Sequence, residues 1–561
     1  MASVNGTTKI MLEPLAWAGS NTHSVFEPSS QRTNYLLSAN SPIRYIVQWT
    51  RGGLLDTTIP SQTGDVVNAI FEIKESMENI PYSDMRTVAT IRKSRDVPNM
   101  AYGGVTYNES GNFIAGGHQF SLDISSIASD LLSYSLVPIN KGTFQTYKFG
   151  GLNGGGTPQD NYIGGSPNTQ VSQYRLSLNG AARRIDIEVK FEVLDSNGNL
   201  TIATNGSLTM NTITVINSAE QWEEDTVNLQ DYIIKKSQYY KFLNNFSSTI
   251  KKPVREEDQA EWLYFYIHNA NDTAYGVSNE MGLKVETFTS AGAAENTFYI
   301  NEFKGLLDIE VGGELSNLQR KVLAQNVSPY FIENTAAAKE KSDEDLVSYA
   351  GSKITSSTSY YRVSLSKIQL TNPYNERRAT EYKYYIIDRE PEHPYGYVRF
   401  HWLNRKGGID SYTAKRDVVE GIGVDRNTFE RKSPDKLWLQ NTSAPSTNYY
   451  DDNMRGDLYK GGAEVLNVNA NRNHSVYTEP LNKDDAKWLE EIITSPNVWI
   501  EHQSEATERR NTQNSYLRPS TKGYIPIVIT NSDAETVNQE SGLVKFNIEF
   551  THSHSINTQR N

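Results

Sequence analysis

The chain contains 561 residues, no cysteine and a formal net charge of −12, with 37% hydrophobic and 11% aromatic residues. The negative charge argues against a nucleic-acid-binding protein, because such a protein needs a basic stripe that neutralises phosphates. The absence of cysteine excludes disulfides, thiolate catalysis and cysteine-bound metals, and it is typical of a protein made in a reducing cytosol.

The first 40 residues are polar and rich in serine and asparagine, without a sustained hydrophobic period. We predict that residues 1–40 form an extended arm that becomes ordered only against a neighbour. The segment from Met1 to Leu12 lacks the charged start and apolar core of a signal peptide. No apolar run approaches the roughly 20 residues that span a bilayer, so we expect no membrane partner.

Residues 41–150 are predicted to form a β-sandwich domain with a short helix. Apolar and polar residues alternate in several short segments, which places successive side chains on opposite faces of a sheet. Ile127, Leu131 and Leu132 have helical spacing and indicate the helix. The predicted strands are 43–49, 69–73, 88–91 and 120–125.

Residues 151–255 are predicted to form a β-rich domain that follows an exposed loop, because 150–167 is dense in Gly, Pro and Asn. Asn197-Gly198 lies at the centre of a predicted hairpin turn, since glycine supplies the positive φ that tight turns need. The predicted strands are 174–178, 185–193 and 200–204.

Residues 256–416 are predicted to form a second β-sandwich block. Its clearest feature is a hairpin in which Tyr397–Trp402 alternates strictly, Asn404–Gly408 turns and Ile409–Tyr412 starts back. The charged, alanine-containing segment 336–349 is predicted to be a surface helix or an insertion. The other predicted strands are 262–267, 283–288, 298–300, 360–370 and 382–387.

Residues 417–561 are predicted to form a C-terminal α+β domain. Asn482 can cap a helix over 483–493, with acidic residues in its first turn and an apolar stripe that includes Trp488 and Ile492. Two terminal strands, 524–530 and 544–550, follow the helix, and 443–457 is predicted to be a loop. The fold class is therefore mainly β, with several β-sandwich domains in tandem before this last domain.

Glycine-rich and acidic motifs each have a simple structural interpretation. Gly150–Gly156 lacks the following helix of a phosphate-binding loop, and Asp195–Asn199 lacks the spacing and the closing Glu of a calcium loop. Adjacent acidic residues in polar surroundings are interpreted as solvated charge, since glycoside hydrolysis needs two carboxylates facing each other across a cleft. These acidic groups are Glu223-Glu224, Asp343–Asp345 and Asp484-Asp485.

His552-Ser553-His554 would place both imidazoles on one face of a strand, but a third metal ligand is not in view, and exposed histidines are the preferred interpretation. Arg455-Gly456-Asp457 matches an adhesion tripeptide, but three common residues in a loop do not establish adhesion. Short basic clusters are interpreted as solvated faces or subunit contacts. They are Arg183-Arg184, Lys251-Lys252, Arg377-Arg378 and Arg509-Arg510. We assign no catalytic, cofactor-binding or metal-binding residue and expect no cofactor.

Three groups of short motifs are spread over most of the chain. They are Phe120–Ser125 with Leu131–Ser133, then Phe400–Tyr412, and finally Ile525–Thr530 with Phe546–Phe550 and Asn557–Asn561. In style these motifs resemble tail and baseplate structural proteins of tailed bacteriophages, especially distal-tail or hub-like proteins of Bacteroidetes-type phages. The resemblance implies stacked immunoglobulin-like or similar β-sandwiches that assemble into rings or collars, and it implies no catalytic positions.

Together, the β-rich pattern and the resemblance predict a non-enzymatic structural protein of a bacteriophage virion, made in the bacterial host cytoplasm. It would be a hub, ring or baseplate component of the tail, with copies of itself and other tail or neck proteins as partners. Sheet edges and the arms and loops 1–40, 150–167 and 443–457 would form the contacts. An alternative is a receptor-binding or carbohydrate-binding tail or head-fibre protein that contacts a host-surface glycan. A polysaccharide-degrading enzyme on a β scaffold is the third hypothesis.

Overall fold

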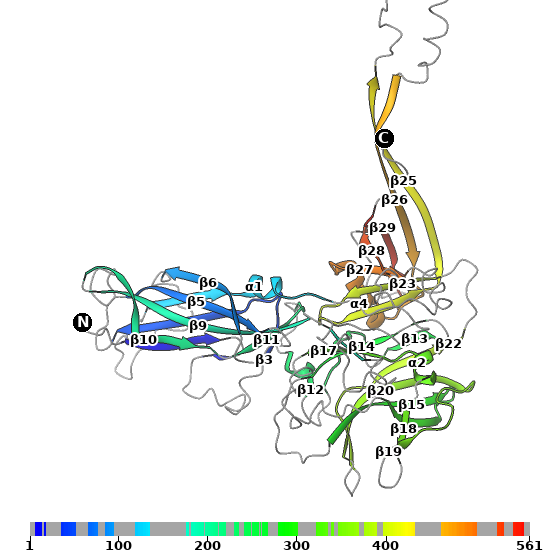
Figure 1. Ribbon diagram of the computed structural model, residues 1–561. Coiled ribbons are helices and arrows are strands. Elements are labelled where there is room, and N and C mark those ends of the chain that lie inside the picture. Colours follow the sequence, from blue (N-terminus) through cyan, green and yellow to red (C-terminus); the bar gives the residue numbers. More distant parts are fainter. Residues whose placement is uncertain are drawn as a thin grey trace, which may run out of the picture. The chain divides into compact units, whose positions relative to one another are not determined.

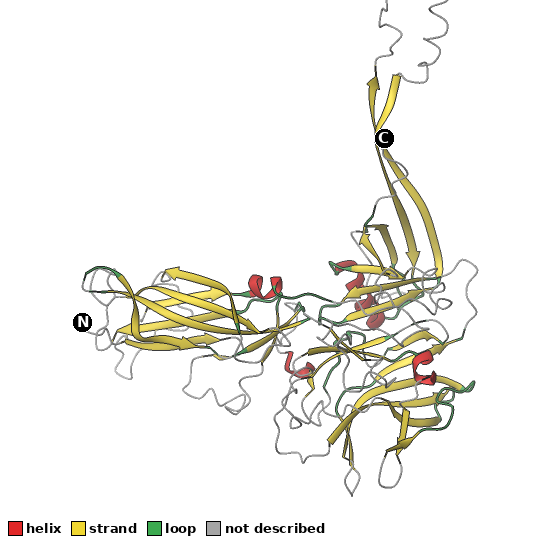
Figure 2. Cartoon of the chain, in the orientation of Figure 1, coloured by secondary structure: helices red, strands yellow, loops and turns green. Residues whose placement is uncertain are grey.

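The computed structural model of the chain consists mostly of strands (Figure 2), which confirms the expected mainly-β fold with several sandwich-like sheets. The structure describes residues 6–13, 16–17, 35–51, 66–76, 85–94, 118–134, 175–178, 181–195, 197–210, 212–219, 229–234, 240–247, 250–256, 259, 261–267, 279–300, 321–334, 338–341, 346–369, 375–389, 397–431, 462–501, 524–531 and 542–554.

The chain divides into two compact units. Unit 1 comprises Met1–Pro391, Trp402–Ser411 and Gln503–Gly523. Unit 2 comprises Glu392–His401, Tyr412–His502 and Tyr524–Asn561.

Unit 1 begins with a sandwich of two sheets (Figure 1). The first has the strand order β2 (Ala16–Trp17), β1 (Gly6–Glu13), β4 (Arg44–Arg51), β7 (His118–Asp123). The second has the order β3 (Tyr35–Ser38), β11 (Ile213–Ile216), β9 (Ala182–Leu194), β5 (Val66–Ser76), β6 (Arg86–Ser94), and β10 (Leu200–Thr209) also pairs with β9. Between the sheets, the Phe191 ring lies 5.4 Å from that of Trp49 and 5.7 Å from that of Phe120, centroid to centroid. The predicted short helix is α1 (Ser125–Asp130).

The described part of the predicted N-terminal arm pairs within its own chain. β1 is antiparallel to β4, and β3 runs parallel to β11, with Tyr35 opposite Ile213. Leu36 is fully buried and Leu37 nearly so. Residues 35–38 therefore order against their own sheet and need no neighbouring molecule.

Two further sheets lie wholly in unit 1. One has the order β12 (Ile233–Ile234), β14 (Trp262–Ile267), β17 (Lys321–Asn326), β8 (Arg175–Leu178), and η4 (Leu229–Tyr232) precedes β12. The other has the order β13 (Lys251–Arg255), β22 (Lys383–Asp388), β20 (Thr358–Gln369), β15 (Asn279–Thr289), β16 (Ala294–Ile300), β18 (Ala338–Lys341), β19 (Leu346–Ser348), and β21 (Asn375–Arg378) pairs with β20.

The segment 336–349 was expected to be a surface helix or an insertion, and the helix expectation is wrong. β18 and β19 form an antiparallel pair there, and β18 joins the edge of β16. Pairing at a sheet edge overrides the weak helix preference of this charged stretch. The helix of this region lies just before it, as α2 (Pro329–Asn334).

The fifth sheet has the strand order β24 (Ile409–Ala414), β23 (Val398–Leu403), β27 (Val498–Glu501), β28 (Tyr524–Ile529), β29 (Asn547–His552), β26 (Gly462–Tyr477), β25 (Arg416–Arg431). Unit 2 contains α4 (Lys483–Thr494), which begins where it was predicted. The Asn482 side chain accepts hydrogen bonds from the backbone N–H groups of Asp484 and Asp485, both at 2.9 Å. Among the described helices α4 is the longest, and neither its 12 residues nor its composition suffices to cross a membrane.

Both predicted hairpin turns are confirmed. Asp195 N–H donates to the Asn199 carbonyl at 2.8 Å, and Asn404 N–H donates to the Gly408 carbonyl at 2.9 Å. The turn glycines Gly198 and Gly407 have φ of 78° and 85°, a conformation that side chains with a Cβ disfavour.

Candidate functional site

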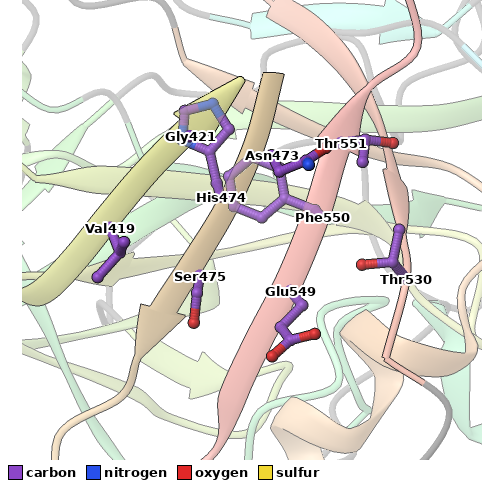
Figure 3. A pocket seen from close by; sticks show the side chains of 9 residues that line it. All are labelled: Val419, Gly421, Asn473, His474, Ser475, Thr530, Glu549, Phe550 and Thr551. Carbon is purple, nitrogen blue, oxygen red and sulfur yellow. The ribbon is translucent and has the colours of Figure 1, made fainter. Parts of the chain in front are cut away.

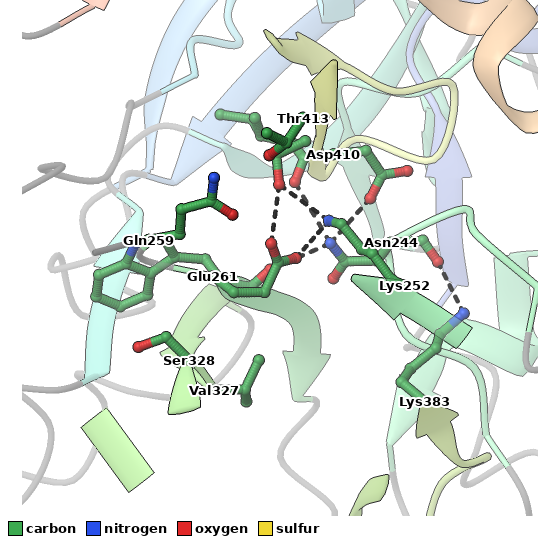
Figure 4. Close-up of polar contacts among 12 residues, drawn as sticks. Asn244, Lys252, Gln259, Glu261, Val327, Ser328, Lys383, Asp410 and Thr413 are labelled. Atoms are coloured by element: carbon green, nitrogen blue, oxygen red, sulfur yellow. Dashed lines mark hydrogen bonds and ion pairs between the residues drawn. The ribbon is translucent and has the colours of Figure 1, made fainter. Parts of the chain in front are cut away.

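A buried polar cluster in unit 1 joins β13, β14 and β24 (Figure 4). Lys252 Nζ donates to Glu261 Oε1 at 2.5 Å and to Ser411 Oγ at 2.9 Å, and the Ser411 hydroxyl donates to Glu261 Oε2 at 3.0 Å. The Lys252 and Glu261 side chains are only 2% and 1% exposed. The interpretation of the Lys251-Lys252 cluster as a solvated face is therefore wrong for Lys252.

The same cluster continues through Asn244 and Asp410 (Figure 4). Asn244 Nδ2 donates to Asp410 Oδ1 at 2.9 Å, and Asn244 Oδ1 accepts from Tyr264 N–H at 2.6 Å. Lys383 Nζ donates to the carbonyl oxygens of Asn244, at 3.1 Å, and of Phe246. Each carboxylate in the cluster is thus paired with a cation or an amide.

Burial and the charge of Glu261 raise the pKa of the neighbouring Tyr264, Tyr361 and Tyr385 well above the usual value, so these phenols stay protonated. Both charges of the Lys252–Glu261 pair are deeply buried, whereas a general acid or base must reach its substrate. We therefore interpret the cluster as an internal structural element.

A shallow groove of about 440 Å³ lies on unit 2, where β25 and β26 leave the rest of the sheet (Figure 3). Gly421 contributes no side chain to it, and both polar and apolar residues line the space. The lining residues are Val419, Gly421, Asn473, His474, Ser475, Thr530, Glu549, Phe550 and Thr551.

The ring of His474 is held by stacking on the face of β26 opposite to Asn473 and Ser475. Its centroid lies 4.7 Å from that of Phe550 and 4.9 Å from that of His552. Burial lowers the pKa of His474, with a smaller opposing effect of Glu420. Of the predicted His552-Ser553-His554 motif, His552 is half-buried in this stack and His554 is exposed. The described ranges contain no group of three or more His, Asp or Glu arranged to hold a metal ion.

β25 and β26 of unit 2 form a two-stranded ribbon, and some of its residues also line the groove. β25 and β26 pair antiparallel along their whole length, from Arg416 opposite Tyr477 to Arg431 opposite Gly462. Within β26, only the residues from Asn473 to Tyr477 pair with β29. Figure 1 shows β25 and β26 extending past β28 and β29. We call the paired β25 and β26 the β25–β26 ribbon.

The two faces of the β25–β26 ribbon differ in chemistry, because the side chains of successive residues point to opposite faces. The register places Ile422, Val424, Val465, Val468 and Ala470 on one face, which we call the apolar face. The opposite face, which we call the asparagine face, carries Asn427, Asn467, Asn469, Asn471 and Asn473.

Much of the apolar surface of the ribbon is open to solvent. Ile422 is 62% exposed and Val424 is 42% exposed, while Leu466, at the bulge in β26, reaches 68%. The apolar face also carries an ion pair, in which Arg472 Nη1 lies 2.7 Å from Glu420 Oε1. A ribbon of only two strands is marginally stable alone in water, so an exposed ribbon with an apolar face is typical of a contact surface.

Sequence inspection missed both the groove and the ribbon. Residues 417–561 were assigned to an α+β domain without a strand over 462–477, although the alternation Asn467-Val468-Asn469-Ala470-Asn471 has the period of a strand. Asparagine and glycine are depleted in strands, which conceals the pattern.

The remaining predicted candidates have structural roles or lie outside the described residues. Asp195 Oδ1 accepts from the N–H groups of Asn197 and Asn199, both at 2.8 Å, which stabilises the turn. Asp484 and Asp485 occupy the first turn of α4. Outside the described residues lie Gly150–Gly156, Glu223-Glu224, Asp343–Asp345, Arg455–Asp457, Arg509-Arg510 and the loops 150–167 and 443–457.

The basic pair Arg183-Arg184 is also less solvated than expected. Arg183 Nε donates to the Leu131 carbonyl at 3.0 Å and lies 3.7 Å from Glu75 Oε2. The Arg184 side chain is only 8% exposed. By contrast, Lys251 is exposed, and its Nζ lies 4.2 Å from the ring centroid of Tyr360.

Comparison with known proteins gives no family assignment. No family model matches the chain, and no curated protein matches it. A solved structure that aligns with it is dimeric latent PorU from Porphyromonas gingivalis, with 11% sequence identity and a TM-score of 0.13. The alignment covers 69% of this chain and 34% of that chain, so this chain spans about a third of its length. A TM-score this low supports no conclusion about fold or function.

Proposed function

We propose that the protein is a non-enzymatic structural component of a bacteriophage virion, a hub, ring or baseplate subunit of the tail. The observation that carries the proposal is the exposed β25–β26 ribbon. Its open strand edge and apolar face suit a subunit whose surface is completed by other subunits, since strand addition joins chains through backbone hydrogen bonds. The phage assignment itself rests on the motif resemblance.

The chemistry of the interior supports a non-enzymatic role. Glu261 and Asp410 are buried carboxylates of the kind that catalysis recruits. Both are fully engaged, with Lys252 and Ser411 in one case and with Asn244 in the other. We interpret these contacts as holding the strands in register. The surface of the protein is then the part that acts, and we expect it to act in assembly.

Two measurements test the proposal. Mass spectrometry of purified phage particles from the host culture should find the chain in the tail fraction at a fixed copy number relative to other tail proteins. Negative-stain microscopy of the purified protein should show multimeric, ring-like or collar-like particles. A compact monomer that never appears in particles contradicts the proposal.

The groove favours the alternative, a carbohydrate-binding fibre protein. Asn473, Ser475, Thr530 and Glu549 present amide, hydroxyl and carboxylate groups around a floor that Gly421 leaves open (Figure 3). Such groups can bind sugar hydroxyls. Saturable binding on a glycan array that is lost on Glu549→Ala, and kept on substitution of a lysine outside the groove such as Lys251→Ala, would favour this alternative.

A further inference from the structure

Among the residues that the structure describes, β25 has a strand partner along one of its two edges. Among the described strands, β25 pairs with β26 alone and ends the sheet. Every residue from Val419 to Glu430 is exposed, apart from the half-buried Gly423. An exposed, regular edge strand is a template for pairing with another chain unless charge or a bulge prevents it.

The regular part of this edge is nearly symmetric about one glycine. β25 has a bulge at Asp417 and then runs without interruption, and the next register shift is caused by Leu466 on β26. The stretch from Val418 to Thr428 is centred on Gly423. Gly423 has no side chain to block a facing backbone, and glycine within a strand often marks a close backbone approach.

We propose that β25 pairs antiparallel with β25 of a second copy of this chain, about a two-fold axis at Gly423. In this register Ile422 lies opposite Val424 of the second copy, and Glu420 lies opposite its Arg426. The two-fold axis repeats both pairs, so each dimer gains two Glu–Arg contacts and two apolar contacts across the interface.

Other registers are less favourable in charge. Centring the pair on Asp425 places Asp425 opposite itself and Glu420 opposite Glu430. Centring it on Ile422 or Val424 brings no opposite charges together in the regular stretch. Opposite-charge and apolar cross-strand pairs each contribute about 0.2–1 kcal/mol, while like charges directly opposite are destabilising. The Gly423 register is therefore favoured.

Pairing in this way yields a four-stranded sheet that spans both molecules. The apolar faces of the two ribbons join into one surface, as do the two asparagine faces, because paired residues keep their faces. The contact is isologous and joins copies two at a time, so it is separate from the heterologous contact that closes a ring. The inference rests on the assembly role proposed above and specifies one contact of it.

Charge reversal gives a test with a built-in control. R426E places Glu420 opposite a glutamate, and E420R places Arg426 opposite an arginine, so each variant should dimerise at least about tenfold more weakly than wild type in sedimentation velocity. An equimolar mixture of the two variants restores both Glu–Arg pairs and should form a heterodimer. N427E adds charge on the other face and should leave dimerisation unchanged.

Cross-linking tests the register directly, because the chain has no cysteine of its own. G423C should form an intermolecular disulfide under mild oxidation, since its two copies face each other at the axis. N427C, at the end of the paired stretch, should not. Wild type that stays monomeric at high concentration, a mixture that fails to associate, or equal cross-linking of both cysteine variants overturns the inference. Detection of the chain in virions would in each case leave the proposed function standing.

Discussion

Replacing Lys252 by methionine should strongly destabilise unit 1. Methionine keeps the length of the apolar stem but removes the ammonium group that donates to Glu261 at 2.5 Å and to Ser411 at 2.9 Å. Glu261, 1% exposed, would be left as a buried carboxylate without its cation. Removing one partner of a buried ion pair costs about 3–5 kcal/mol.

The adjacent lysine provides a matched control. Lys251 lies on the opposite face of β13, where it is exposed and 4.2 Å from the ring centroid of Tyr360. Lys251→Met removes the same group at a site where such a contact contributes about 0.5–1 kcal/mol. Urea unfolding followed by tryptophan fluorescence should therefore separate the two variants, with Trp262, beside Glu261, as a probe.

A double variant isolates the charge effect. Lys252→Met combined with Glu261→Gln removes both charges, and its loss of unfolding free energy should be smaller than the sum of the two single losses by about 2 kcal/mol. The reasoning is refuted if Lys252→Met costs no more than Lys251→Met, or if the two single losses are additive.

Three further predictions concern stability. Asn482→Ala removes the cap of α4 and should lower the unfolding free energy of unit 2 by about 1 kcal/mol, measured by urea denaturation; an unchanged midpoint contradicts the cap assignment. Gly407→Ala, at φ 85° and with a new Cβ 3.0 Å from the Asn217 carbonyl oxygen, should cost at least about 1–2 kcal/mol in thermal unfolding, whereas Gly421→Ala, whose Cβ meets open space, should cost less than half of this. Hydrogen bonds from Ser357 and Thr358 lower the pKa of Glu295 in the folded state, so its stabilising effect is complete above the unfolded pKa near 4.5 and is lost as the pH falls through the lower folded pKa. The stability difference between wild type and Glu295→Gln should accordingly shrink between pH 6 and pH 3, and a constant difference excludes this role.

Local chemistry explains which parts of the fold could be predicted. Each hairpin turn, at Gly198 and at Gly407, depends only on residues within five positions along the chain. The same holds for the helix cap at Asn482, so the sequence alone indicates all three features. The alternating strand of Ile185 to Val193 is equally clear, because one of its faces is buried.

The rest of the structure depends on partners distant in sequence. Lys251 and Lys252 are adjacent lysines, and only the packing of β13 against residues near Glu261 and Ser411 makes the second one a buried ion-pair partner. The β25–β26 ribbon escaped prediction for a different reason. Its strands obtain their order from each other and contain many asparagine and glycine residues, which are poor indicators of a strand.

The parallel pairing of β3 with β11 sets an order of events during synthesis. Tyr35 of β3 leaves the ribosome long before its partner Ile213, which is encoded about 180 positions further along the chain. At translation speeds of roughly 5–20 residues per second, this strand waits on the order of 10–35 s for its neighbour. During that interval Leu36 and Leu37 lack the strand that pairs with them, so chaperone occupancy of the nascent chain should be higher before β11 emerges than after it.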